Sequence, residues 1–493
     1  MRPDQPQRAG EDRSGFARVR YLTNAIPRLA VSVFVISAAA SMLIIYSSPD
    51  QSLNPVSWTV GSLDIVAVAG PPSLLLLLAA LLMVVALVAL VVAADSWAAR
   101  LVTDPARRPE DRRDRVLRTE VTAVRSTPHV DVTVLIPAHN EEHGLGATLA
   151  SLHRQTRQPK KVWVIADNCS DRTAAIAAEH GAAVFETRDN ENKKAGALNQ
   201  LLGSLLPEMQ ESDAILVMDA DTVMRDEFLD VAATHMETTP ELDAVGGVFY
   251  GDSTRGLIGQ LQRNEYVRYA RDISRHYGRV FVLTGTASLF RADALAAVAA
   301  ARGMVLPGTP GQVYDTLSLT EDNELTIALK TLGARIVSPK QCGVVTELMP
   351  TLGDLWRQRQ RWQRGALENI GTYGMQASTA RYWMQQLGIG YGAIALNAYL
   401  LITVLTLWAL DFVPVLIFWL LMGALFMIER IVTVWDGGWR ARLLAAPLLI
   451  ELAYDWFLQA VYVKSIVDIL TGRRREWNHV RYTAESPSSV VAS

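Results

Sequence analysis

Long apolar segments on both sides of a polar central stretch most constrain how this chain can fold. Residues 29–46 and 73–94 precede the stretch, and apolar runs cover about residues 385–410, 412–434 and 443–470 after it. Because a helix of about 20 apolar residues can cross a bilayer, we expect membrane helices at both ends of the 493-residue chain and a water-soluble domain between them.

The distribution of arginine predicts which side of the membrane the soluble domain faces. Arginine is frequent before residue 29 and after residue 94, whereas residues 47–72 contain neither lysine nor arginine. Because positive charge favours the cytoplasmic side, we expect a hairpin in the plasma membrane and a cytoplasmic soluble domain. The alternative is a cleaved signal peptide over residues 29–46, with a small-residue site at residues 38–40.

The last apolar run is harder to place. Glu451 and Asp455 lie in it, four residues apart and therefore on one helix face. An odd number of spans would place Arg473 outside, against the charge rule, so either this run is partly interfacial or a neighbouring run does not cross. The two acids are candidates for a polar path through the membrane or for pairing with a partner protein.

Composition excludes two classes of protein. The formal net charge is −3, whereas nucleic-acid-binding proteins present a basic surface, so we expect no nucleic-acid partner. The two cysteines, Cys169 and Cys342, are too few for a disulfide framework.

Short apolar runs alternate with helical patterns from about residue 130 to 345 and predict an α/β domain with a mostly parallel sheet. The expected strands are residues 132–136, 162–165, 183–185 and 215–218, and the expected helices are residues 145–154, 171–180, 194–206 and 323–332. Ligands of such sheets bind beyond the carboxyl ends of the strands. Residues 137–141, Asp167, Asp219 and Asp221 follow expected strands, so we expect them in one pocket.

The acids after these strands suggest their chemistry. Asp219 and Asp221 suit Mg²⁺ or Mn²⁺, which favour one or two carboxylates together with diphosphate oxygens; a turn or strand cap is the alternative. Asp167 is a candidate acceptor of hydrogen bonds from a nucleobase or a ribose. The alternative there is an ordinary loop in which Ser170 or Asp171 caps the next helix.

Two further motifs begin helices. Lys194 lies where a lysine and a helix N-terminus together favour phosphate, although an exposed lysine explains the pattern equally well. Thr320, Glu321 and Asp322 precede the expected helix 323–332. They suit either an N-cap followed by acids that favour the helix dipole or a general base, Asp322, that takes a proton from an acceptor hydroxyl.

Residues 352–370 show an amphipathic pattern that contains Gln358, Arg361 and Trp362. A basic amphipathic helix with tryptophan commonly lies on a membrane surface, and we expect this of residues 351–375 as a whole. Arg361 and Trp362 are also candidates for closing the pocket.

Taken in order, these motifs resemble glycosyltransferase family 2, in particular its membrane-integrated processive branch of cellulose, chitin, hyaluronan and poly-N-acetylglucosamine synthases. The resemblance covers about residues 130–375. It implies a GT-A (Rossmann-like) cytosolic domain inserted between N-terminal and C-terminal transmembrane helices. The expected divisions are a cytosolic tail (1–28), a transmembrane hairpin (29–94), a basic linker (95–129), the GT-A domain (130–350), the amphipathic helix (351–375), the C-terminal membrane region (385–470) and a tail (471–493).

The resemblance also implies site residues. Those for the UDP-sugar donor would be Asp167, Lys194, Asp219, Gln358 and Arg361, and those for the acceptor would be Gly285, Glu321 and Trp362. Asp221 would ligate Mg²⁺ or Mn²⁺, and Asp322 would be the base of a single inverting displacement. Residues 285–288 depart from the cellulose synthase version, which weakens cellulose as the product.

The function implied by the resemblance is extension of a β-linked polysaccharide and its translocation across the membrane. The expected partners are a UDP-sugar, a growing glycan or lipid-linked acceptor, and membrane lipid. Single addition of a sugar to a lipid or a lipid-linked sugar is the alternative enzyme, and a membrane scaffold that keeps a nucleotide-binding domain is the alternative without activity.

Overall fold

A computed structural model describes residues 32–44, 56–60, 63–67, single positions between 75 and 89, and residues 129–473 apart from 211, 254–255, 276–277, 279, 410–411 and 415–416. The chain divides into two compact units. The first comprises residues 1–112 and 401–424, and the second comprises residues 113–400 and 425–493. The predicted N-terminal tail, nearly all of the basic linker and of the C-terminal tail, and most of residues 73–94 lie outside the described residues.

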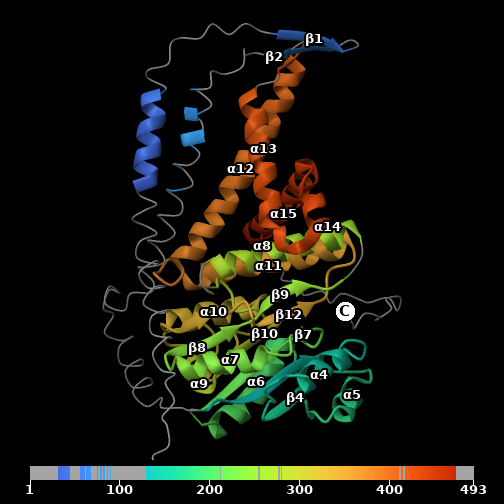
Figure 1. The fold of residues 1–493 in the computed structure, drawn as a ribbon. Coiled ribbons are helices and arrows are strands. Elements are labelled where there is room, and N and C mark those ends of the chain that lie inside the picture. The colour runs from blue at the N-terminus through green and yellow to red at the C-terminus, as the bar shows by residue number, and fades with distance from the viewer. Residues whose placement is uncertain are drawn as a thin grey trace, which may run out of the picture. The chain divides into compact units, whose positions relative to one another are not determined.

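A seven-stranded mixed sheet forms the centre of the second unit, with the order β11-β8-β10-β6-β3-β4-β5 (Figure 1). Its strands are β3 (Asp131–Ala138), β4 (Lys161–Ala166), β5 (Ala183–Glu186), β6 (Asp213–Met218), β8 (Leu242–Gly246), β10 (Ala287–Arg291) and β11 (Arg335–Val337). β10 is antiparallel to its neighbours β6 and β8, and the other four pairings are parallel. The prediction of a mostly parallel sheet is therefore confirmed.

Helices cover both faces of this sheet, and β3 shows why. Val134 and Ile136 pack in one cluster with residues of α4, α5 and α7, whereas Leu135 packs in another with residues of α6, α9 and α10. The helices are α4 (Leu145–His153), α5 (Thr173–Glu179), α6 (Lys193–Leu205), α7 (Phe228–Thr238), α9 (Ala292–Ala301) and α10 (Glu321–Thr331). Because both faces are buried, the strands are continuously apolar in sequence.

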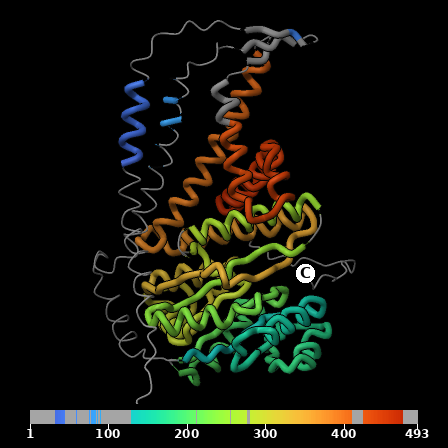
Figure 2. The backbone as a smooth tube through the Cα atoms, viewed as in Figure 1, coloured from blue at the N-terminus to red at the C-terminus, as the bar shows by residue number. Residues whose placement is uncertain are grey.

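A second, three-stranded sheet joins segments that the sequence did not identify. Its order is β7-β12-β9, from β7 (Val223–Met224), β12 (Gly343–Thr346) and β9 (Val248–Gly251). The 19-residue helix α8 (Leu257–Arg275) packs on β9. Figure 2 follows the chain from this region to α11 (Leu352–Tyr373), the helix that covers the predicted amphipathic segment. α11 packs against α10 and α15.

The C-terminal helices are α12 (Ala380–Ala409), α13 (Ile417–Thr433), α14 (Gly438–Ala445) and α15 (Leu448–Leu470). Within the described residues, α12 is the one helix long and apolar enough to cross a membrane. The segment Trp435–Ala445 and α15 would add a second span if this pair, bent by 98°, counts as one. The helix Ser32–Ile44 is apolar but shorter than a span. Multiple membrane crossings therefore stay a prediction.

The two acids of the last apolar run have charged partners inside the second unit. Glu451 is 1% exposed and lies 2.7 Å from Arg268, and Asp455 lies 2.7 Å from Arg430. Burying a carboxylate is costly unless a cation compensates its charge. These pairs explain how a segment with two acids forms one helix.

The described strands of the first unit form a separate small sheet. β1 (Val56–Val60) and β2 (Leu63–Ala67) form an antiparallel hairpin, and β13 (Phe412–Pro414) pairs parallel with β2. The hairpin falls in the lysine- and arginine-free stretch that the sequence predicts to lie outside the cell.

Candidate active site

One cavity of about 1490 Å³ lies at the carboxyl edge of the large sheet. All ten predicted site residues line it: Asp167, Lys194, Asp219, Asp221, Gly285, Glu321, Asp322, Gln358, Arg361 and Trp362. Asp167 follows β4, and Asp219 and Asp221 follow β6. β10 runs antiparallel and begins where β6 ends, with Ala287 opposite Met218, so the loop before β10 reaches the same edge. The sheet topology thus brings together residues that are distant in sequence.

Asp167 is fixed by three polar neighbours. Its Oδ1 accepts hydrogen bonds from Asn190 Nδ2 at 2.8 Å, Thr187 Oγ1 at 2.9 Å and Asn168 Nδ2 at 3.2 Å. The residue is only 7% exposed and lines the cavity. Asp171 lies just before Arg172, the N-cap of α5, and its Oδ1 accepts a hydrogen bond from Thr173 N, in the first residue of the helix, at 3.0 Å. The carboxylate of Asp167 is thus oriented in advance for a ligand with a polar hydrogen.

Gly196 in α6 leaves the space that Asn190 occupies. A Cβ at this position would lie 2.1 Å from Asn190 Oδ1. We expect Gly196→Ala to displace Asn190, to release Asp167 and to raise the Kd for UDP about tenfold, which calorimetry would measure. Gly203→Ala is the matched control, because this glycine lies in the same helix and a Cβ there meets nothing within 4 Å. Equal UDP affinities of the two variants would contradict the role given to Asn190.

Lys194 joins the two acidic motifs. Its Nζ lies 2.6 Å from Asp219 Oδ1 and 3.2 Å from Glu321 Oε1. Burial disfavours the charged lysine, but the two carboxylates outweigh it and hold the pKa of Lys194 above its ordinary value. The sequence predicted that Lys194 contacts phosphate, whereas the structure pairs it with the carboxylates of Asp219 and Glu321. Glu321, predicted to lie at the acceptor, therefore also forms an ion pair with Lys194.

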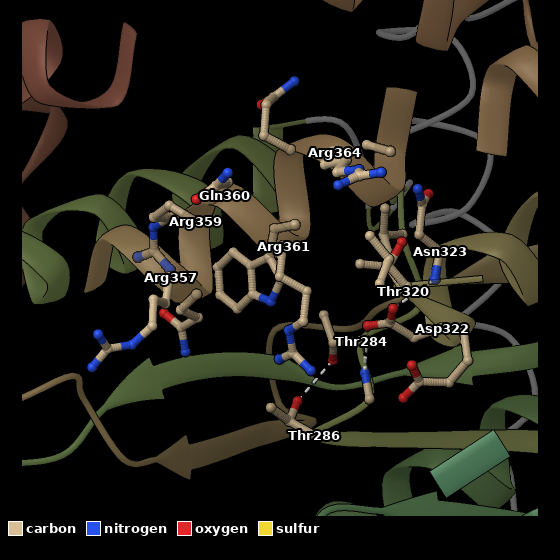
Figure 3. A pocket seen from close by; sticks show the side chains of 18 of the residues that line it. Thr284, Thr286, Thr320, Asp322, Asn323, Arg357, Arg359, Gln360, Arg361 and Arg364 are labelled. Carbon is tan, nitrogen blue, oxygen red and sulfur yellow. Dashed lines mark hydrogen bonds between the residues drawn. The ribbon is translucent and has the colours of Figure 1, made fainter. Parts of the chain in front are cut away.

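Asp322 lies in the first turn of α10, with its carboxylate directed into the cavity (Figure 3). Its Oδ2 accepts a hydrogen bond from Gly285 N at 3.1 Å, and its Oδ1 accepts one from Asn323 N at 2.7 Å. Burial and the neighbouring Glu321 carboxylate raise the pKa of Asp322 to about 6, against the opposing charge of Lys194. Such a carboxylate is ionised at neutral pH and is a stronger base than an ordinary aspartate.

This pKa predicts an acidic limit of activity. A base accepts a proton only when it is ionised, so we expect the transferase rate to fall as the pH drops through about 6 and to stay high above it. The measurement is kcat against pH at saturating donor. A limb near the ordinary aspartate value of about 3.9 would contradict the raised pKa of Asp322 as the control of the rate.

Carboxylates outnumber cations around Asp221. Burial, Asp219 and Glu347 raise the pKa of Asp221 to about 7. Burial and the carboxylates of Asp221, Glu347 and Asp219 raise the pKa of Glu141 to about 8. Within the described residues, no group of three or more His, Cys, Asp or Glu side chains forms a complete metal site. A divalent cation fits here if diphosphate oxygens complete its ligands, because hard cations accept such mixed oxygen sets.

α11 closes the cavity from the side opposite the sheet. Figure 3 shows Arg361 reaching from α11 towards Thr284 and Asp322. Its charge acts on the pKa of both Glu321 and Lys193, lowering each. The guanidinium of Arg359 packs on the ring of Trp362, with Cζ 4.3 Å from the centre of the ring. Gln358 Oε1 also accepts a hydrogen bond from Arg359, at 2.6 Å.

Arg359, which the sequence did not single out, holds this end of α11. It is 5% exposed and lies 2.9 Å from Glu265 of α8. Glu347 was also missed. It directly follows the short strand β12, as Asp167 directly follows β4. An acid directly after an apolar strand is the sequence feature that would have identified Glu347. Arg359 has no comparable signal, because its acidic partner, Glu265, belongs to a different helix, α8.

A helix-covered α/β sheet, with carboxylates and cations facing each other at the carboxyl ends of its strands, is the architecture of a GT-A-like domain. Residues 128–365 match the model of "Glycosyltransferase like family 2". This part of the chain is a family 2 glycosyltransferase domain.

Similar proteins are enzymes of polysaccharide synthesis by name. The poly-beta-1,6-N-acetyl-D-glucosamine synthase of Staphylococcus aureus is 27% identical over 244 residues, which are 48% of this chain and 55% of that protein. The protein of the same name from Staphylococcus epidermidis is 26% identical over the same shares. The chain thus spans about half the length of these relatives.

Among solved structures, the mannosyltransferase of Pyrobaculum calidifontis in complex with GDP-Man and Mn²⁺ is 16% identical, with a TM-score of 0.43. The match covers 77% of this chain and 99% of that one. So distant a likeness carries no conclusion about the donor or the metal of this protein.

Proposed function

We propose that the chain is a membrane-bound inverting glycosyltransferase that uses a UDP-sugar to extend a β-linked polysaccharide. The observation that carries the proposal is the single cavity of a family 2 domain that Asp167, Asp221, Asp322 and Arg361 line together. The names of the relatives support a polysaccharide product.

The residues act at the two ends of one displacement. At the acceptor, the Asp322 carboxylate takes the proton of the attacking hydroxyl as its oxygen bonds to the anomeric carbon of the donor. At the leaving group, the Arg361 guanidinium binds the departing diphosphate and stabilises its growing charge, with Lys193 beside it. Asp167 holds the uridine. Attack from the side opposite the diphosphate turns an α-linked donor into a β-linked product.

Asp221 would hold the divalent cation, Mg²⁺ or Mn²⁺, which when bound supplies positive charge to the diphosphate. The mutual repulsion of the carboxylates of Asp221, Glu141 and Glu347 supports this assignment. Lys194 would keep Asp219 in place beside the donor, since it already pairs with that carboxylate.

The cavity is larger than the donor site. It continues from Trp362 between α12 and α15, where apolar and charged side chains line it together with amide and aromatic ones. The amide and aromatic residues are Gln363, Tyr382, Gln385, Gln386, Gln459 and Tyr462. Gln459 Oε1 is buried there and accepts no hydrogen bond from the described part of the chain. Hydroxyl-rich sugars suit such a lining. We propose that this extension receives the growing glycan and directs it along α12 across the plasma membrane, with the donor site on the cytoplasmic side.

The experiment that tests the proposed function is UDP release by the purified protein with Mn²⁺. UDP-glucose, UDP-N-acetylglucosamine and UDP-glucuronate are supplied one at a time, and we expect turnover with one of them. No turnover with any of the three would count against the proposal.

Product length separates the two candidate enzymes. A polymer that elutes early from a sizing column requires repeated addition, whereas a single-addition enzyme yields a lipid that carries one more sugar. The continuation of the cavity beyond Trp362, between α12 and α15, favours the polymer.

A further inference from the structure

Three side chains on one face of α10 contact the loop that precedes β10. Asp322, Thr326 and Lys330 follow each other at intervals of four residues and therefore lie one above the other on the helix. Each forms hydrogen bonds with the backbone of residues 280–285. Most of this loop lines the cavity, and Asp322 is the proposed base.

The contacts follow the loop in order. Gly285 N donates to Asp322 Oδ2 at 3.1 Å, and Leu283 N donates to Thr326 Oγ1 at 2.9 Å. The hydroxyl of Thr326 in turn donates to the carbonyl oxygen of Asp322 at 2.7 Å, and Thr326 is fully buried. One hydroxyl therefore ties the loop to the backbone of the proposed base itself.

Lys330 fixes the far end of the loop. Its Nζ donates to Val280 O at 2.8 Å, Phe281 O at 2.9 Å and Tyr382 Oη at 2.8 Å. These three oxygens can accept all three protons of its ammonium form, although burial and the nearby Arg381 lower the pKa of Lys330 to about 7. Tyr382 belongs to α12 and also donates to Phe281 O. The partners of Lys330 are neutral oxygens of the loop and of α12. The acids of the site pair with Lys194 instead.

From this arrangement we infer that Thr326 and Lys330 are positioning residues, which hold residues 280–285 along α10 so that the Gly285 amide stays on the carboxylate of Asp322. The inference rests on the proposed role of Asp322. A backbone N–H favours the ionised form of the carboxylate that it contacts. Losing the register of the loop would therefore disorient the base and make it easier to protonate.

Other groups also act on Asp322, and the test must leave them in place. They are Glu321 of the same helix, Lys194 of α6, Asp219 after β6, Tyr269 of α8 and Tyr314. Arg361 of α11 also reaches towards Asp322 (Figure 3). The hydrogen bonds described above for Thr326 and Lys330 involve none of these side chains. A substitution at Thr326 therefore changes the loop contact and leaves the charges around the base unchanged.

The experiment uses Thr326→Val in the full-length protein, because valine has the shape of threonine without its hydroxyl. We expect kcat to fall about tenfold or more, as misplacement of a catalytic group commonly costs. The donor KM should stay unchanged, the acidic limb of the pH profile should move to higher pH, and Thr326→Ser should restore both values. Lys330→Met should act in the same direction.

Thr331→Val is the matched control. This threonine lies in the same helix, but its hydroxyl donates to Ile327 O at 2.8 Å and meets Ser378 Oγ, away from the loop. Hydrogen exchange of residues 280–286 gives a readout independent of activity and should be faster in Thr326→Val than in Thr331→Val. Unchanged exchange in Thr326→Val, or a lower melting temperature with unchanged kcat and pH limb, would overturn the inference. An inactive wild-type protein would instead overturn the proposed function, while the exchange result still decides the role of the loop.

Discussion

Asp322→Asn will lower kcat for sugar transfer by at least about a hundredfold, the size expected of a lost general base. The amide keeps the shape of the carboxylate, and its oxygen can still accept the hydrogen bond from Gly285 N. It cannot, however, take the proton of the attacking hydroxyl. Binding of UDP should change little, because the contacts of Asp167 lie elsewhere in the cavity. The measurements are UDP release at saturating donor and calorimetric binding of UDP.

The control for this prediction is Asp230→Asn. Asp230 also lies in the first turn of a helix, α7, but it is exposed and does not line the cavity. Comparing the two variants separates loss of catalysis from loss of helix stability, because an acid in the first turn stabilises a helix by about 0.3–1 kcal/mol. If Asp322→Asn kept the activity of Asp230→Asn, the proton would have to go to another group.

Asp221→Asn will lower the transfer rate at least about a hundredfold, because the departing diphosphate loses the positive charge of the cation that stabilises it. The same variant should bind UDP with equal affinity in the presence and absence of Mn²⁺, whereas the unmodified protein should bind it more tightly with the metal. Removing the metal with a chelator should reproduce the loss of rate in the unmodified protein and have no further effect on the variant.

Asp226→Asn provides the comparison. Asp226 is close in sequence, but it is an exposed partner of Arg154 and lies outside the cavity. It should keep both the rate and the effect of Mn²⁺ on UDP binding. The metal assignment fails if Asp221→Asn retains the Mn²⁺ dependence of the unmodified protein.

The local pattern of residues was enough to predict the sheet and the location of the site. The expected strands 132–136 and 215–218 lie inside β3 and β6, because strands buried on both faces are apolar without interruption. Polar residues directly after such strands gather at one edge of a parallel sheet. For this reason the prediction that Asp167, Asp219 and Asp221 share a cavity is confirmed.

The partners of these residues could not be predicted in the same way. Lys194 pairs with Glu321, and Gly285 donates to Asp322, across long separations in the chain. The antiparallel strand β10 creates the second contact, since it carries the preceding loop to the carboxyl edge of the sheet. Short-range periodicity holds no information about such contacts.

The sequence by itself determined the kind of domain, the family it resembles and the acids that face the ligand, because burial and strand ends leave a local record in the order of residues. Only the tertiary structure decided which cation compensates which acid, which amide rests on Asp322 and how the cavity continues between α12 and α15. The physical reason is that hydrogen bonds and ion pairs depend on distances of about 3 Å, and those distances are set by the packing of whole helices.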